Sequence, residues 1–138
     1  MSIKSLSIVT IWCTLSVGAC STAPTSQVQS PRAQSELAEA LAGRTPGPAV
    51  RCIPSYRSNQ MQVIDDYTIL FRDGRTVYLQ KPSGGCPGIS SGGRTLVSRK
   101  FGTTDTCEGD INHIVDMPSG MHSGSCVFGP FVPYTKPR

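Results

Sequence analysis

The six cysteines of this 138-residue chain constrain its fold more than any other feature. Two of them lie within the first 20 residues. The other four are spread over the rest of the chain: Cys52, Cys86, Cys107 and Cys126. Disulfides persist in oxidising compartments and are rare in the cytosol, so the role of these four depends on where the chain is delivered. The first 20 residues therefore decide how the remainder is interpreted.

The amino-terminal segment has the pattern of an export signal. Lys4 precedes an apolar run over residues 6–17. A membrane-spanning helix needs roughly 20 apolar residues, so a run of about a dozen fits the apolar region of a signal peptide instead. The run ends at Val17-Gly-Ala-Cys20, which resembles the bacterial lipobox, where small residues precede a cysteine that is acylated before cleavage. We predict a signal peptide over residues 1–19 and lipidation at Cys20, the alternative being ordinary cleavage near Ala19 or Ala23.

Lipidation would anchor the mature chain to a membrane through Cys20. A second acyl chain on the new amino terminus would make the anchoring stable, because one chain alone gives only marginal binding. Ser21, rather than an aspartate, follows the cysteine, and this resembles the pattern of lipoproteins sorted to the outer membrane. We therefore expect a lipid-anchored protein on the periplasmic face of the outer membrane, with a soluble periplasmic protein as the alternative.

Export favours disulfides for the four remaining cysteines, because an even number of cysteines in a small exported domain is typical of a disulfide framework. Zinc sites of four cysteines use closely spaced pairs, since one tight turn must direct two sulfurs at one metal. Successive spacings of 34, 21 and 19 residues provide no such pair. The sequence predicts two disulfides and no metal site.

The pairing of the four cysteines is open, because four cysteines allow three connectivities. We expect Cys52–Cys126 and Cys86–Cys107. Cys52 lies in the first predicted strand and Cys126 in the last clear one, and the first and last strands of a small closed or two-layer β-domain often lie together. The alternative that we consider next is Cys52–Cys86 with Cys107–Cys126.

Two kinds of segment follow the signal peptide. Residues 21–30 are small and polar and predict a flexible tether. Ser30-Pro31 then predicts the start of a short helix, with serine as the N-cap and proline at the first helical position. Apolar residues follow at helical spacing, and Gly43 fits the helix end. Such a helix either packs on the domain edge or remains a spacer.

From residue 49 onward, short apolar runs are separated by Gly, Pro and Asp, a pattern that predicts strands. The predicted strands cover residues 49–53, 60–64, 67–72, 75–80, 95–101, 111–116, 125–128 and 131–134. The predicted fold is all-β, a small disulfide-bonded sandwich or barrel. We divide the chain into a signal peptide (1–19), a lipidated tether with one helix (20–48), and the β-domain (49–138).

Asp73-Gly74 is a strong hairpin signal between two of these strands. A two-residue turn at this point would place Leu70 opposite Val77 and Ile69 opposite Tyr78. Both faces of the hairpin would then carry apolar pairs, so we expect it to be buried on both sides.

Several motifs of the chain resemble those of a group of uncharacterised small exported proteins, including lipoproteins, of proteobacteria. The motifs lie within residues 40–135: Gly43-Arg-Thr-Pro-Gly47, Arg51-Cys-Ile-Pro54, Ile64-Asp-Asp-Tyr-Thr-Ile-Leu-Phe71, Thr76-Val-Tyr-Leu79, Cys107-Glu-Gly-Asp110 and Phe128-Gly-Pro-Phe-Val-Pro-Tyr134. The resemblance implies export and the extent of the domain. It implies no activity, because none is established for the group.

The residue types that carry chemistry are sparse. His113 and His122 are expected to be ordinary surface histidines, although Asp110 or Asp116 would be the third ligand if they bound a metal. No G-x-S-x-G elbow, closely spaced cysteine pair or phosphate-binding loop is present, and Asp65-Asp66 predicts a turn. We predict no catalytic residues, no cofactor and no enzymatic activity.

The charges also argue against nucleic acid as a partner. The formal net charge of +4 falls to +3 once Lys4 leaves with the signal peptide, and the remaining basic residues are scattered. We expect an envelope lipoprotein with a structural or accessory role and an envelope protein as partner. The alternative is a periplasmic binding module for a small ligand or a partner protein, using the loops at residues 84–93 and 117–124.

Overall fold

A computed structural model of the chain describes residues 28–57, 60–100 and 102–138. The predicted signal peptide, Cys20 and most of the predicted tether lie outside the described residues. The elements are, in order, α1 (Pro31–Leu41), β1 (Thr45–Pro46), β2 (Cys52–Ile53), the short 3-10 helix η1 (Ser55–Arg57), β3 (Met61–Asp65), β4 (Thr68–Asp73), β5 (Thr76–Gln80), β6 (Arg94–Ser98), β7 (Thr106–Cys107), β8 (Ile111–Asp116), β9 (His122–Val127) and β10 (Phe131–Thr135).

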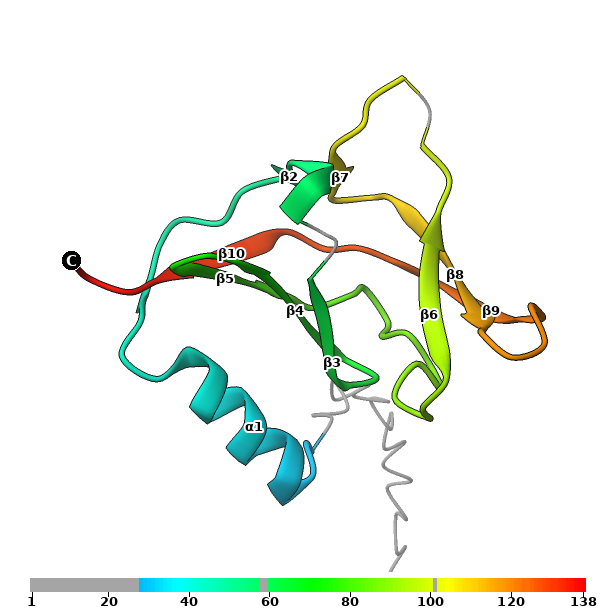
Figure 1. Ribbon diagram of the computed structural model, residues 1–138, viewed down its shortest axis with the longest axis horizontal. Coiled ribbons are helices and arrows are strands. Elements are labelled where there is room, and N and C mark those ends of the chain that lie inside the picture. Colours follow the sequence, from blue (N-terminus) through cyan, green and yellow to red (C-terminus); the bar gives the residue numbers. More distant parts are fainter. Residues whose placement is uncertain (1–27, 58–59, 101) are drawn as a thin grey trace, which may run out of the picture.

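The strands form three antiparallel sheets (Figure 1). The largest has the order β1-β10-β5-β4-β3, a second has the order β6-β8-β9, and β2 pairs with β7 alone. Side chains from both larger sheets share one buried cluster, which includes Phe71 and Phe131 from the five-stranded sheet and Ile114 from the three-stranded one. The predicted fold class, a small disulfide-bonded all-β domain preceded by one short helix, is confirmed. Within the described part of the chain, no helix is long and apolar enough to cross a membrane.

The helix begins where the sequence predicts. Ser30 is the N-cap, and its side-chain oxygen accepts a hydrogen bond from the backbone N–H of Ala33 at 3.2 Å. Pro31 occupies the first turn, where its missing N–H costs nothing. Gly43 follows the helix with φ +65°, a backbone conformation that favours glycine.

Helix α1 packs on the face of the five-stranded sheet that points away from the three-stranded one. Ala33 and Ala40 are buried there, and the half-buried Leu37 and Leu41 pack against a cluster that contains Leu70. Strand β1 pairs with β10 and extends the same sheet. Both elements precede residue 49, and of the two possibilities left open for the helix, packing on the domain is the one observed.

The β4–β5 hairpin is buried on both sides, as predicted. Ile69 belongs to the cluster between the sheets, whereas Leu70 belongs to the cluster under α1. The predicted register is wrong by two positions, because Leu70 lies opposite Leu79. Asp73 remains in the strand, and the glycine that follows it supplies the one positive φ that a type II′ turn needs. A type I′ turn over Asp73-Gly74 would have required positive φ at both residues.

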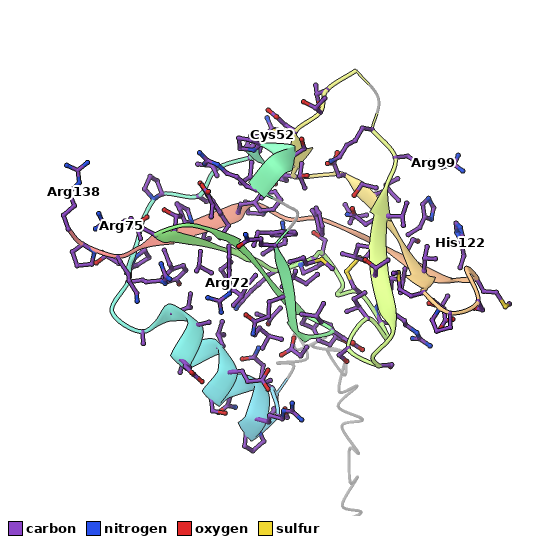
Figure 2. The ribbon with its side chains drawn as sticks, viewed as in Figure 1. Cys52, Arg72, Arg75, Arg99, His122 and Arg138 are labelled. Carbon is purple, nitrogen blue, oxygen red and sulfur yellow. A yellow bond between two sulfur atoms is a disulfide. The ribbon has the colours of Figure 1, made fainter. Side chains whose placement is uncertain are left out.

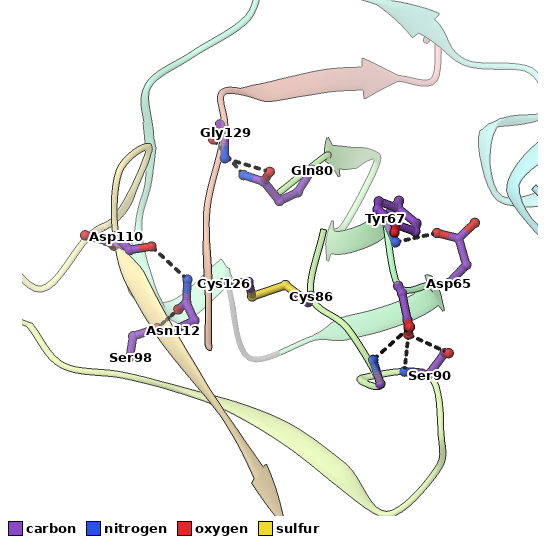
Figure 3. Close-up of a disulfide and its surroundings, with 12 residues drawn as sticks. Asp65, Tyr67, Gln80, Cys86, Ser90, Ser98, Asp110, Asn112, Cys126 and Gly129 are labelled. Carbon is purple, nitrogen blue, oxygen red and sulfur yellow. Dashed lines mark hydrogen bonds between the residues drawn. A yellow bond between two sulfur atoms is a disulfide. The ribbon is translucent and has the colours of Figure 1, made fainter. Parts of the chain in front are cut away.

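The disulfides are Cys52–Cys107 and Cys86–Cys126, so both pairings considered from the sequence are wrong. Cys52 and Cys107 are direct partners in the short β2–β7 sheet, which the sequence pattern does not reveal. Cys86 lies in the loop after β5 and reaches Cys126 on β9, within the cluster between the two larger sheets (Figure 3). The expected pairing assumed that Cys52 and Cys126 lie in the first and last strands, but Cys126 lies in β9, and β10 follows it.

Candidate functional site

A groove of about 450 Å³ lies between the first turns of α1 and the loop that connects β5 to β6. Its charged side chains are Arg32, Glu36 and Arg94. Val63, Ile64 and Ile89 supply apolar lining, and Ser30, Ala33, Ser90 and Gly92 complete it. The groove therefore combines charged groups with an apolar surface, a combination typical of ligand sites.

Asp66 holds one wall of the groove in place, through hydrogen bonds to Gly88 and Ser90. Its carboxylate accepts hydrogen bonds from the backbone N–H of Gly88 at 2.7 Å and from the Ser90 backbone N–H and hydroxyl at 3.0 and 2.6 Å. Burial raises the pKa of this carboxyl, but the hydrogen bonds from Ser90 and Gly88 and the nearby Arg94 guanidinium together leave it lowered. Asp66, in the predicted turn at Asp65-Asp66, thus also holds the β5–β6 loop through hydrogen bonds.

Gly88 lets the loop approach Arg94 closely. Its φ is +83°, and a Cβ at this position would lie 2.3 Å from a guanidinium nitrogen of Arg94. That guanidinium donates a hydrogen bond to the Gly88 carbonyl oxygen at 2.8 Å. The positive φ therefore favours glycine here, and a Cβ would displace the end of the Arg94 side chain from this hydrogen bond.

A smaller pocket of about 250 Å³ shares Ser30 and Ser90 with the groove and lies next to the start of the described chain. Gln29 is fixed there, because its side-chain amide donates to Asp65 at 2.7 Å and to Thr68 at 2.8 Å. The groove thus lies close to Val28 and Gln29, the first described residues.

The loop at residues 84–93, one of the two named for the alternative binding module, contributes Ile89, Ser90 and Gly92 to the groove. The other predicted loop, at residues 117–124, contacts the end of the first loop, because the backbone N–H of Met117 donates to the Gly93 carbonyl oxygen at 2.7 Å. The residues of this second loop do not line the groove.

The two histidines lie together on neighbouring strands, which the sequence pattern did not suggest. The ring centroids of His113 and His122 are 5.3 Å apart. The carboxylates named as further ligands are engaged elsewhere: Asp110 accepts from Lys100 and from the Cys107 backbone, and Asp116 accepts from Ser119. No group of three or more metal-ligating side chains occurs in the described part of the chain.

The charged lining of the groove was missed from the sequence. Arg32 and Glu36 lie one turn apart in the predicted helix, and their ion pair at 2.8 Å is of the usual helical type, so their shared face could have been found. The position of Arg94 beside the helix could not have been found from the sequence, because it depends on the packing of the β5–β6 loop.

Comparison with known proteins gives no further guide. No family model matches the chain, and no match was found among curated proteins or among solved structures.

Proposed function

We propose that this chain is an exported envelope lipoprotein, anchored through Cys20, with an accessory and non-enzymatic role. The observation that carries the proposal is the pair of disulfides. They are compatible with an oxidising exported compartment, where such bonds persist. The lipobox-like sequence before Cys20 adds the anchor.

Export is tested through the redox state of the cysteines in cells. In the full chain, the four cysteines from Cys52 onward should resist alkylation until a reductant is added. Deletion of residues 2–19 should leave the chain in the cytosol with these cysteines reduced and alkylated at once. The proposal fails if both forms show the same thiol labelling.

A second function is supported by the groove: the binding of a small ligand or of a segment of a partner protein. Arg32 and Arg94 offer guanidinium donors beside the apolar side chains of Ile64 and Ile89. Guanidinium groups pair in a bidentate manner with carboxylates and phosphates. The groove therefore suits a ligand that carries an acidic group next to an apolar one.

The anchor would keep this groove close to the membrane. Val28 follows Cys20 by eight positions, and eight extended residues span at most about 29 Å. The groove lies at the same end of α1 as Val28 and Gln29. Partners are therefore expected among molecules at or near the membrane surface.

Site-specific photo-crosslinking in cells tests the groove. A photoreactive residue in place of Glu36 lies at the groove and leaves both guanidinium groups in place, whereas one in place of Ser35 lies on the same helix, is exposed to solvent and does not line the groove. We expect an adduct from position 36 that is absent from position 35. Equal adducts from both positions, or none from either, would exclude the groove as a binding site.

A further inference from the structure

The outer face of the three-stranded sheet carries the only two histidines of the chain. His113 lies in β8 and His122 at the start of β9, and their ring centroids are 5.3 Å apart. Figure 2 shows His122 and Arg99 extending away from the domain on this side of the sheet. Such a pair is open to solvent and to ions.

A β-bulge places the second histidine on this face. Along β8, the partners of Ile111, His113 and Ile114 on β9 follow regular register, with Ile114 opposite Gly124. Val115, however, lies opposite His122 rather than Ser123, so one extra residue is present in β9. Side chains alternate between the two faces of a strand, so this extra residue turns the side chain of His122 to the face that His113 occupies. Without the bulge, the two rings would point to opposite faces.

The separation of the rings fits a shared metal ion. A metal bound at roughly 2.0–2.1 Å from a ring nitrogen lies roughly 3.2 Å from the centroid of that ring, so two rings that share one ion have centroids no more than roughly 6.4 Å apart. The observed 5.3 Å lies within this limit. His122 is exposed and His113 half-buried, so the ring of His122 in particular can turn about its side-chain bonds and direct either nitrogen at the ion.

Few charged groups lie near the two histidines. The pocket of about 380 Å³ beside His113 is lined by Arg99 and Asp110, and the Asp110 carboxylate is already paired with Lys100. Arg94 and Asp116, paired at the far end of β6 and β8, lie on the opposite face of the sheet. The strand partners of His113 are uncharged, with Val97 on one side and Ser125 on the other.

We propose that His113 and His122 together bind one Cu²⁺ ion. Imidazole nitrogen suits late first-row transition metals, and among the divalent ions Cu²⁺ binds most tightly to a given set of nitrogen ligands. Water completes the coordination, because only two protein ligands are provided. The binding is reversible, and this site is separate from the groove beside α1.

The test uses the full chain in mild detergent, with an acetylated amino terminus and with Cys13→Ser and Cys20→Ser, so that neither an amine nor a free thiol from these positions competes for copper. Titration with Cu²⁺ should give one ion per chain. Electron paramagnetic resonance should show coupling to imidazole nitrogens, which only these two residues can supply. This spectrum is measured on the unaltered pair, so it remains decisive even if a variant fails to fold.

Variants distinguish chelation from two independent histidines. His113→Ala and His122→Ala should each weaken Cu²⁺ binding by more than about tenfold, because a second ligand on the same surface acts at high effective concentration. The double variant should lose the imidazole signature, whereas Val127→Ala, a change on the same face, should retain both. A loss of only about twofold in each single variant, as expected for two independent sites, would overturn the proposal, as would an imidazole signal that persists in the double variant.

Discussion

The disulfide inside the domain should contribute more to stability than the one at its periphery. The double variant Cys86→Ala with Cys126→Ala removes a disulfide between residues that are 40 positions apart. The loop-closure model assigns about 4 kcal/mol to such a link. Cys86 is fully buried and Cys126 is 5% exposed, so loss of the two sulfurs also leaves a cavity. The free-energy cost of that cavity is roughly 1–2 kcal/mol in total, from the value for burial of small apolar groups. The expected loss is therefore about 5–6 kcal/mol.

The matched control is Cys52→Ala with Cys107→Ala, which removes a link over 55 positions. The loop-closure model again gives about 4 kcal/mol. Cys52 is exposed, so no comparable cavity forms. Urea unfolding followed by circular dichroism measures both losses by linear extrapolation. The reasoning is refuted if the variant without Cys86–Cys126 loses less than about 2 kcal/mol, or if the control variant loses more than the Cys86–Cys126 variant. A loss of about 5–6 kcal/mol would bring a domain of this size close to unfolding.

Three further outcomes follow from the packing. Leu37→Ala with Leu41→Ala should lower the free energy of unfolding by about 2 kcal/mol, because both side chains lose contact with the sheet; an unchanged urea midpoint would mean that α1 is dispensable. The pKa of Asp66 is lowered in the folded chain, so its contribution to stability is complete above the unfolded pKa of about 3.9 and is lost as pH falls through the folded pKa. The melting temperature of the native chain should therefore fall more steeply below about pH 4 than that of Asp66→Asn. Parallel curves for the two chains would contradict this. Gly88→Ala should destabilise more than Gly92→Ala in thermal unfolding, since both have positive φ but only Gly88 also meets another side chain; equal losses would show that the contact is relieved at no cost.

Local features of the fold could be predicted from the sequence. The start of α1 follows from Ser30-Pro31, because capping depends on two adjacent residues. The bounds of β8 match the predicted residues 111–116, a short run rich in β-branched residues that is flanked by turn residues. The burial of both faces of the β4–β5 hairpin follows in the same way from its apolar pairs.

Features that depend on long-range pairing could not be predicted. The β2–β7 sheet consists of two residues on each side, too few for a periodic pattern, and it alone brings Cys52 next to Cys107. The place of Cys86 depends on how the glycine-rich loop folds between the sheets. The two histidines meet only because of a bulge, and although Gly124 within the strand can signal one, it does not show which residue is the extra one.

Metabolic labelling with a fatty-acid analogue tests the central claim, anchoring through Cys20, most directly. The wild-type chain and the matched variant Cys13→Ser should both incorporate the label, because Cys13 is removed with the signal peptide. Cys20→Ala should not be labelled and should no longer sediment with the membrane. Equal labelling of the wild type and Cys20→Ala, or no labelling of either, would contradict the proposal of a lipid-anchored envelope protein.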